Sequence, residues 1–430
     1  MDLHRSPRQS IHDKRESRSD GSIFPTFFMG GFECSTFVWK DHERKDYVEA
    51  TGHDRHLKAD YAAAMDLGIG AVREAIRWPQ VDLGNGQYDW SSVKSVQDAA
   101  TECKITPIWD ICHYGFPDGC DPFSKDCRER FVDYCRAAAQ FVTSTADGPY
   151  FFTPINEITF FSAAASDLGW MYPFAKGREA ELKRALCHMA IEGAKAIREV
   201  ERGARMVHVD PIVNAVAPAD RPDLADEAEQ EERKEDFEAF DMLSGRLAPE
   251  LGGSPEILDI VGVNIYHYSQ VQLQADKSRE ILGPQDPRRK PLSELLQLVW
   301  QRYRRPVIIG ETSGFQDNRA EWLRMTMEEC LKALNAGIDL HGVCLYPFVD
   351  VPDWWTQKWA KIGIYDVADK EQFERLPCDP YIEELRHWQK LLDQPANVEP
   401  DGYGEEWGRV ELGEVRKYAA KWAKDERPAP

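Results

Sequence analysis

Two glutamates that could act as a catalytic pair end apolar runs of the sequence. Glu157 closes the run 152–157, which reads FTPINE, and Glu311 follows the apolar run 306–310. Hydrolysis of a glycosidic bond needs such a pair of carboxyl groups. One group donates a proton to the leaving oxygen, and the other attacks the anomeric carbon or activates a water molecule. The two glutamates can share this chemistry only if the fold brings them to one cavity.

The elements that would position these glutamates follow a regular pattern. Short apolar runs alternate with longer amphipathic stretches, such as 54–67 and 320–336, which is typical of successive βα units. Eight units in series favour a single closed (β/α)₈ TIM barrel of the α/β class over an open doubly wound sheet. No glycine-rich phosphate loop follows the first strand, which also argues against a nucleotide-binding sheet. We expect the strands at residues 27–34, 71–78, 105–112, 150–156, 205–209, 258–266, 306–311 and 342–348.

In a barrel of this type, catalytic groups project from the C-terminal ends of the strands. Glu157 and Glu311 end strands four and seven, so we expect them to face each other across the barrel mouth. The polar residues that end the expected strands are Arg73, His113, Asn156, Glu157, Tyr266 and Glu311.

These strand ends resemble those of one known group of enzymes. The FTPINE run is similar to the strand-four acid/base motif of the clan A glycoside hydrolases, and residues 307–314 resemble their strand-seven nucleophile motif. The resemblance implies a retaining β-glycosidase that works by double displacement through a covalent glycosyl-enzyme. It covers roughly residues 26–366 in the right order. Closer features resemble glycoside hydrolase family 1, the β-glucosidase family, at residues 72–79, 107–117, 259–266 and 350–354.

The resemblance implies catalytic roles for five residues. Glu157 would be the acid/base, and Glu311 would be the nucleophile. Glu157 must start protonated, so burial and the Glu311 charge should raise its pKa. Arg73 would favour the ionised form of Glu311, and Tyr266 would donate a hydrogen bond to the same carboxylate. Asn156 would bind the 2-hydroxyl of the sugar.

The same resemblance implies a set of sugar-binding residues. His113 and Asp353 would bind hydroxyl groups, and Trp354 would supply a surface on which the sugar stacks. Glu33 is the nearest polar residue where the family has a glutamine, and Tyr346 stands where a tryptophan is expected. The catalytic residues therefore look retained, while the sugar-binding residues differ from the family pattern.

Four other residues depart from the pattern. Ile158 replaces a proline after the acid/base, and Thr312 replaces an asparagine after the nucleophile. Glu74 and Arg77 lie in strand two, where the family is more apolar, and the pattern assigns them no role. Arg73 could pair with Glu74 instead of Glu311.

Three functions are compatible with these motifs. The first is a retaining β-glycosidase, and the second is a transglycosidase in which an acceptor replaces water in the second step. The third is a non-catalytic carbohydrate-binding barrel, which has no need of an acid facing a nucleophile. Tyr268 is an alternative to Tyr266 as the donor to the nucleophile.

Composition limits the kinds of partner. The chain has 74 acidic and 53 basic residues, a formal net charge of −21, which argues against nucleic acid and anionic membranes. We expect a carbohydrate or glycoside as the partner. No cofactor or metal is expected, because no His/Cys/Asp cluster has ligand spacing and two carboxylates suffice for the chemistry.

The ten cysteines show no paired spacing of the zinc type. Four of them, Cys112, Cys120, Cys127 and Cys135, lie close together in sequence. Free thiols in a reducing compartment are the favoured interpretation. A disulfide between Cys120 and Cys127 is the less favoured alternative.

The ends of the chain differ in composition from its centre. Residues 1–22 are polar and predict a disordered tail, ahead of a catalytic barrel at 23–393. Residues 394–430 form a polar extension with a helical stretch near 414–424, and residues 220–238 predict an exposed helix. No apolar run reaches the ~18 residues that span a bilayer, and no signal-peptide core is seen, so we expect a cytoplasmic protein.

Overall fold

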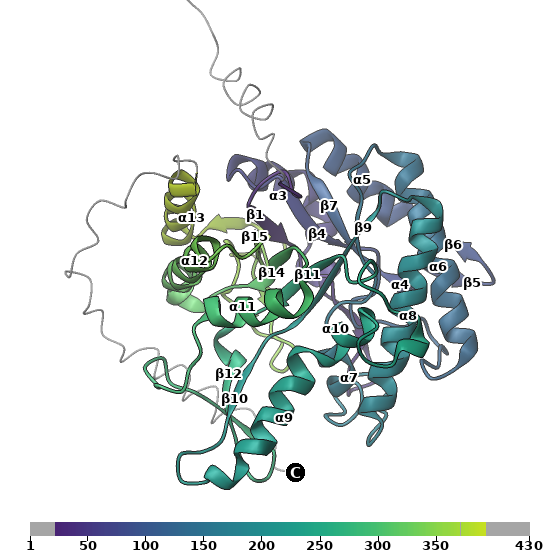
Figure 1. The fold of residues 1–430 in the computed structure, drawn as a ribbon. Coiled ribbons are helices and arrows are strands. Elements are labelled where there is room, and N and C mark those ends of the chain that lie inside the picture. The colour runs from purple at the N-terminus through teal and green to yellow at the C-terminus, as the bar shows by residue number, and fades with distance from the viewer. Residues whose placement is uncertain (1–21, 370, 393–430) are drawn as a thin grey trace, which may run out of the picture.

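The computed structural model describes residues 22–369 and 371–392. Its centre is a closed barrel of eight parallel strands (Figure 1), which confirms the predicted (β/α)₈ barrel. The expected N-terminal tail, apart from Ser22, and the expected C-terminal extension lie outside the described residues. In their hydrogen-bonding order, the barrel strands are β1 (Phe28–Gly31), β15 (Leu340–Leu345), β14 (Val307–Thr312), β11 (Ile260–Asn264), β9 (Arg205–Pro211), β8 (Phe151–Thr153), β7 (Thr106–Asp110) and β4 (Ala71–Ala75).

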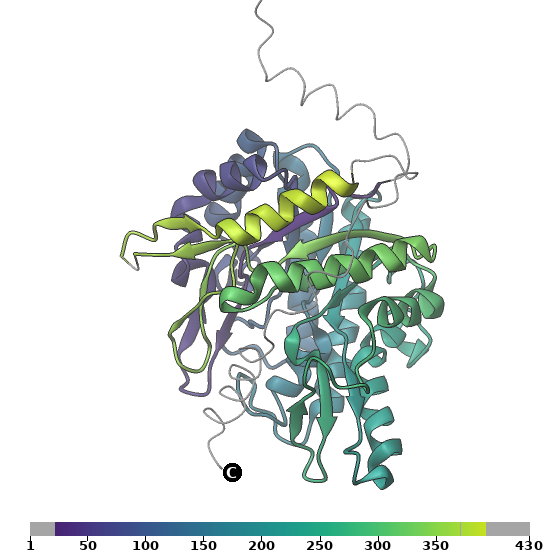
Figure 2. The ribbon, with the colours of Figure 1, turned by 90° about the vertical axis from the view of Figure 1, so that its left-hand side faces the viewer.

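A helix follows each barrel strand and lies on the outside of the barrel (Figures 1 and 2). Helices α12 and α13 run side by side, as do α6 and α8, so the outer face of the sheet is covered. Among the described helices, none is both long and apolar enough to cross a bilayer. The eight helices are α3 (His53–Asp66), α5 (Ser91–Cys103), α6 (Lys125–Thr145), α8 (Glu179–Val200), α10 (Glu238–Leu243), α11 (Leu292–Tyr303), α12 (Arg319–Asn335) and α13 (Asp379–Leu392).

The barrel interior is filled with apolar side chains. Successive side chains of a strand point to opposite faces, so Val207 and Val209 of β9 point inward, while Met206 packs in the outer layer. The barrel is therefore a packed core, and polar chemistry is left to the C-terminal ends of its strands. The inner cluster consists of Phe24, Met29, Ala71, Ile108, Phe151, Val207, Val209, Ile260, Ile308, Cys344 and Tyr346.

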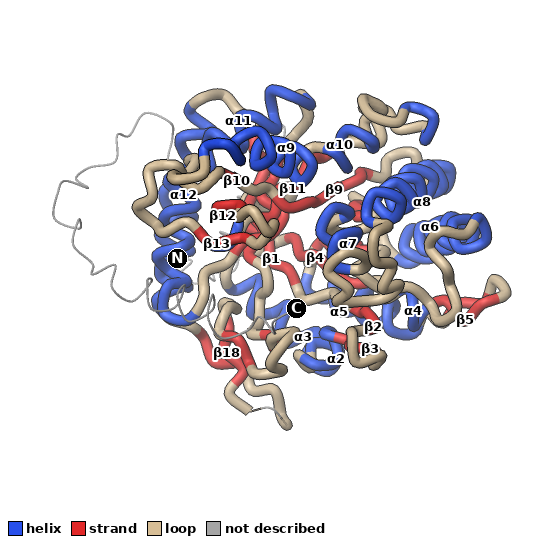
Figure 3. The backbone as a smooth tube through the Cα atoms, turned by 90° about the horizontal axis from the view of Figure 1, so that it is seen from below, coloured by secondary structure: helices blue, strands red, loops and turns tan. Residues whose placement is uncertain are grey.

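The remaining elements belong to the loops. Helix α9 lies beside the sheet β10–β12–β13 (Figures 1 and 3), and it is the helix predicted within residues 220–238. The loop helices are α2 (Tyr47–Ala50), α4 (Trp78–Val81), α7 (Ile158–Ala164) and α9 (Ala225–Asp236), with 3₁₀ turns η1 (Pro222–Leu224), η2 (Pro249–Leu251), η3 (His267–Ser269) and η4 (Gln316–Asn318). The small sheets are β2 (Thr36–Val38) with β3 (Arg44–Asp46), β5 (Asp82–Gly84) with β6 (Gln87–Tyr88), β10 (Asn214–Val216) with β12 (Gln270–Leu273) and β13 (Arg279–Ile281), β16 (Val351–Pro352) with β17 (Trp359–Ala360), and β18 (Tyr365–Val367) with β19 (Arg375–Pro377).

Several barrel strands end earlier than predicted. Strand β8 stops at Thr153 and not at Asn156, and β1 stops at Gly31 and not at Cys34. The residues beyond these ends leave the strand ladder, and Asn156 among them binds side chains from β4 and from the loop after β7.

Cys120 and Cys127 form a disulfide, with their Cα atoms 5.4 Å apart. The prediction of free thiols is wrong for this pair, and the less favoured alternative is correct. The loop before α6 folds back on the first turn of that helix and brings both side chains within disulfide reach, which residue spacing cannot reveal. The other eight cysteines, all within the described residues, are free as predicted. Disulfides persist mainly in oxidising compartments, so this pair argues against the expected reducing compartment.

Candidate active site

The turn between β8 and α7 positions Glu157. This residue has a left-handed backbone with φ of 43°, which is uncommon outside glycine and is often found at functional sites. Two contacts from β9 hold the turn. The Glu157 N–H donates to the Val209 carbonyl at 3.0 Å, and the Asp210 carboxylate accepts from the Thr159 N–H at 3.1 Å and from its hydroxyl at 2.8 Å.

Glu311 lies near the end of β14 with both carboxylate oxygens bound. Arg73, fully buried on β4, donates from Nη1 to Oε1 at 2.6 Å. The Tyr266 hydroxyl donates to Oε2 at 3.0 Å. A charged donor and a neutral donor thus hold Glu311 in one orientation, and the guanidinium favours its ionised form.

Glu157 differs from Glu311 in its partners. Neither of the two groups that donate to it carries a charge. Asn264 of β11 donates from Nδ2 to Oε1 at 2.9 Å, and the Tyr114 hydroxyl donates to Oε2. A carboxyl group with neutral partners keeps a proton more readily than one paired with an arginine. The environments of Glu157 and Glu311 therefore differ in the way that an acid and a nucleophile require.

Asn156 connects the two carboxyl groups. Its Oδ1 accepts from Arg73 Nη2 at 2.6 Å, and its Nδ2 donates to the Tyr114 hydroxyl at 2.9 Å and to His113 Nε2 at 3.0 Å. Protein partners therefore occupy both amide N–H groups. Oδ1 keeps a second lone pair, which can accept from a sugar 2-hydroxyl, the expected partner of Asn156.

Burial raises the pKa of both glutamates. For Glu157, the hydrogen bonds from Tyr114 and Asn264 oppose this effect. For Glu311, burial outweighs the lowering effect of Arg73, and the Glu157 charge adds to the rise, to about 7. The two groups repel each other when both are ionised, so they share one proton, and the guanidinium of Arg73 against Glu311 favours placing that proton on Glu157.

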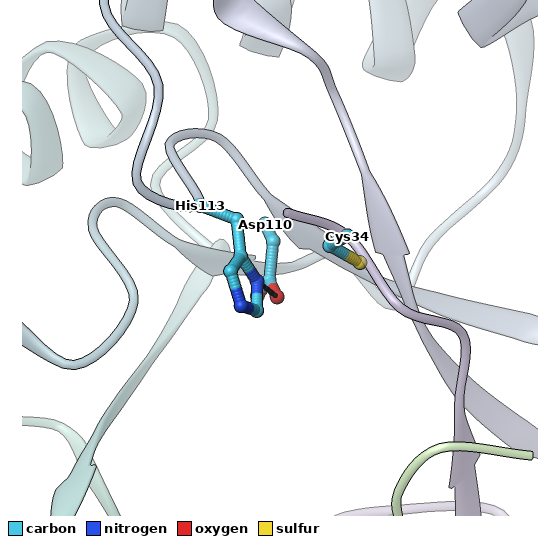
Figure 4. Close-up of side chains that lie close together, drawn as sticks. All are labelled: Cys34, Asp110 and His113. Carbon is cyan, nitrogen blue, oxygen red and sulfur yellow. Dashed lines mark hydrogen bonds and ion pairs between the residues drawn. The ribbon is translucent and has the colours of Figure 1, made fainter. Parts of the chain in front are cut away.

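Asp110, at the end of β7, contacts both Arg73 and His113. Its Oδ2 accepts from Arg73 Nη2 at 2.6 Å and contacts His113 Nδ1 at 3.0 Å. Asp110, His113 and Cys34 form one group whose potential ligand atoms lie within 4.8 Å of one another (Figure 4). The Cys34 thiol donates to the Phe32 carbonyl at 3.0 Å, and the Arg73 charge already balances Asp110. These contacts fit the orientation of Arg73 better than a cation site.

Glu33 and Tyr346 form the other side of the site. Glu33 Oε1 accepts from the Ser35 N–H at 3.0 Å and lies 3.9 Å from His113 Nε2. The Tyr346 hydroxyl accepts from a backbone N–H, and its ring lies 5.1 Å from the Arg73 guanidinium carbon. A Cβ atom on Gly31 would come within 2.1 Å of the Tyr346 ring, so only glycine leaves room for this tyrosine.

The last two expected sugar-binding residues differ in their placement. Trp354 belongs to an aromatic group beside the acid/base, with its ring 5.8 Å from that of Tyr114 and 6.0 Å from that of Phe160. Asp353 accepts from the Thr356 N–H and hydroxyl at 2.7 Å and 2.8 Å and so closes its own loop. Within the described residues, no hydrogen bond joins Asp353 to the site.

The structure also places the residues that the sequence pattern left without a role. Glu74 faces away from Arg73 and binds His53 Nε2 at 2.9 Å, so the alternative pairing of Arg73 with Glu74 is not formed. Arg77 pairs with Asp46 at 2.8 Å.

Tyr268, the alternative to Tyr266, stacks on that residue with ring centroids 5.3 Å apart. The side chain of Tyr268 is half exposed, and Tyr266 is the residue that donates to Glu311.

Sequence reasoning missed four residues of the site: Tyr114, Asp110, Asn264 and Asp210. Asp110 and Asn264 each end an observed strand, so the rule used for the other residues could have found them. Tyr114 follows the end of β7 by four residues, whereas Asp210 comes directly after the expected strand at 205–209, so the same rule could have found it. Only the packing of β7, β8 and β9 brings these two beside Glu157.

Replacing Arg73 with methionine should lower both activity and stability. Glu311 and Asp110 would stay buried without their cation, which costs about 3–5 kcal/mol. The pKa of Glu311 would rise further, so the acidic limb of kcat/KM should move to higher pH. A carboxyl group with a raised pKa destabilises the fold as it ionises, so the loss of stability should be larger at about pH 8 than at about pH 5. Urea unfolding and rate profiles at several pH values measure both effects.

Arg319→Met is the matched control for Arg73→Met. Arg319 is also buried and pairs with Asp366 at 2.6 Å, away from the glutamate pair. Arg319→Met should lower the free energy of unfolding, but the acidic limb of its kcat/KM profile should stay at the same pH. An unshifted limb in Arg73→Met would contradict the role given to this arginine.

The fold resembles that of the clan A glycoside hydrolases, and in particular family 1. Similar solved structures include the AHE enzyme from Alicyclobacillus herbarius, 18% identical, which covers 87% of this chain and 100% of its own with a TM-score of 0.71. A family 1 β-glucosidase from Thermotoga maritima is 17% identical over 84% of this chain and 96% of its own, with a TM-score of 0.67. A β-glycosidase from Pyrococcus horikoshii is 16% identical over 86% of this chain and 95% of its own, with a TM-score of 0.69. No protein-family model and no curated protein matches the chain.

Proposed function

We propose that this protein is a retaining β-glycosidase that hydrolyses O-glycosidic bonds through a covalent glycosyl-enzyme. One observation carries the proposal: two buried glutamates from opposite parts of the barrel belong to one hydrogen-bond network, and only one of them is paired with a cation. Pure sugar binding has no need of this asymmetry, which therefore argues against a non-catalytic barrel.

In the first step, Glu311 attacks the anomeric carbon while Glu157 donates its proton to the leaving oxygen. Arg73 and Tyr266 orient the attacking carboxylate. The bond from the anomeric carbon to the leaving group breaks, and an ester bond to Glu311 forms.

In the second step, Glu157 is ionised and takes a proton from water, which attacks the anomeric carbon. The ester bond breaks, Glu311 regains its charge beside Arg73, and Glu157 regains its proton. Each step inverts the anomeric carbon, so the product keeps the β configuration.

A panel of aryl β-glycosides tests the proposal. Release of the aryl alcohol from at least one member, without added metal or cofactor, is the expected result. The same panel, extended by α-glycosides, would show which sugars and which anomeric configuration the protein accepts. Absence of cleavage across all members would favour the non-catalytic barrel.

A transglycosidase remains the second candidate, because the aromatic group around Trp354 offers a surface for an acceptor beside the acid/base. Adding acceptor alcohols to the assay distinguishes the two reactions, since a transglycosidase would form glycosides in preference to free sugar.

Two β-glucosidase structures of the same fold from Thermotoga maritima were solved in complex with glucoimidazole and deoxynojirimycin. Both compounds are suitable binding probes for this site. We also propose a cytoplasmic location, which the sequence predicts and against which the Cys120–Cys127 disulfide argues.

A further inference from the structure

Tyr114 is the one aromatic hydroxyl that donates to Glu157 among the described residues. It is buried and left-handed, with φ of 67°, so the backbone holds it in an unusual conformation directly after His113. Its oxygen accepts from Asn156 Nδ2 at 2.9 Å. Because that oxygen accepts from Asn156, the hydrogen of the Tyr114 hydroxyl is left to point at the Glu157 carboxyl.

This bond completes a continuous chain between the two glutamates. Glu311 accepts from Arg73, Arg73 donates to Asn156, Asn156 donates to Tyr114, and Tyr114 donates to Glu157. The three bonds from Arg73 through Asn156 and Tyr114 to Glu157 all have their donors pointing toward Glu157. Hydrogen bonds in such a series polarise one another, so the positive charge of Arg73 is felt at the far carboxyl group.

We propose that Tyr114 is a positioning residue that orients the acid/base Glu157 and favours its ionised form during the second step of the reaction. The proposal rests on the proposed function. In the glycosyl-enzyme, Glu311 is an uncharged ester, so Arg73 keeps Asp110 as a counter-ion but loses the charge of Glu311. The guanidinium then acts through Asn156 and Tyr114 on Glu157, at the stage when this group must take a proton from water.

Tyr114 itself does not change its charge in this scheme. Burial, followed by the Glu157 charge, holds the pKa of Tyr114 well above its usual range, so its hydroxyl keeps its proton. Other groups also act on Glu157 and stay in place when Tyr114 is changed. The titratable and charged groups that face Glu157 are Arg73 on β4, His113 and Tyr114 after β7, Asp210 on β9, Tyr266 and Tyr268 after β11, and Glu311 on β14.

Tyr114→Phe tests the proposal, because it keeps the ring and removes only the hydroxyl. Glu157 loses a donor to its ionised form, so its proton is held more tightly and the basic limb of kcat/KM should move to higher pH. With substrates that have very good leaving groups, kcat should fall about tenfold and KM should fall with it, as the glycosyl-enzyme accumulates.

Tyr134→Phe is the matched control. Tyr134 is equally buried, and its hydroxyl donates to the Ile76 carbonyl at 2.9 Å, outside the barrel mouth. It should lose comparable stability without a change in the pH profile or in kcat. If Tyr114→Phe does not fold, Tyr114→Met fills the space without a donor and carries the same expectation.

A titration that needs no substrate separates this inference from the proposed function. In protein labelled with carbon-13 at glutamate carboxyls, the signal missing from Glu157→Gln identifies Glu157. Its NMR titration midpoint should lie at higher pH in Tyr114→Phe than in the parent. An unshifted midpoint and an unshifted limb would overturn the role of Tyr114. A shifted midpoint in a protein that cleaves no glycoside would support the effect of Tyr114 on the ionisation of Glu157 and would overturn the proposed function.

Discussion

Glu311→Gln is expected to abolish glycoside cleavage, with a loss of kcat/KM on the order of 10⁵-fold. Glutamine keeps the shape of the side chain and its contact with Tyr266, but it cannot form the ester bond of the intermediate. Because the proposed route has no other nucleophile at the anomeric carbon, substrates with good and poor leaving groups should be affected alike. Steady-state rates on two aryl glycosides that differ in leaving group measure this.

Glu74→Gln is the matched control for Glu311→Gln. Glu74 is a buried glutamate on β4, but it faces His53 and Tyr61 outside the mouth. The control should lose stability and keep its rate per folded molecule. A 2-fluoro-2-deoxy glycoside should also label Glu311 in the parent protein, as peptide mass mapping would show, and a label on another residue would contradict the assignment.

Glu157→Ala is expected to show the second largest effect, and this effect should depend on the leaving group. Poor leaving groups need the proton that Glu157 supplies, so their cleavage should fall by about 10²–10⁴-fold. Very good leaving groups need little proton donation, so the first step should survive. Added azide should then raise the turnover of good substrates, because it replaces the water that Glu157 would have activated.

Glu157→Gln controls for the space that alanine opens. Glutamine fills the space and its amide oxygen can still accept from one of the two donors, Asn264 or Tyr114, so azide should have little effect on this variant. A uniform loss for all leaving groups in Glu157→Ala, without azide rescue, would count against Glu157 as the acid/base.

The barrel and the two glutamates could be predicted from the sequence because their signals are local. Each apolar run that forms a buried parallel strand is visible by itself, and the fold requires functional side chains at strand ends. Arg73, Tyr266 and Asn156 follow from the same rule. Arg73 and Tyr266 contact Glu311 as expected, while the sugar contact of Asn156 and the role of each residue are still predictions.

The rest of the site depends on contacts between loops that have no sequence signal. Tyr114 lies in the loop after β7 and contacts Glu157 because β7 and β8 are neighbours in the barrel. The same holds for Cys120 and Cys127, whose pairing depends on how one loop folds against α6. Asp353 shows the opposite case, since its place after strand eight predicts a sugar contact while its carboxylate binds its own loop.

The configuration of the first-formed product tests the central claim most directly. Retention requires carboxyl groups about 5–5.5 Å apart with one acting as nucleophile, whereas inversion requires roughly 6.5–9.5 Å to admit water. Proton NMR recorded in the first minutes of hydrolysis of a β-glycoside shows the anomeric signals before mutarotation mixes them. The account predicts that the β-anomer appears first. The α-anomer as the initial product would contradict the double displacement by Glu311 and Glu157.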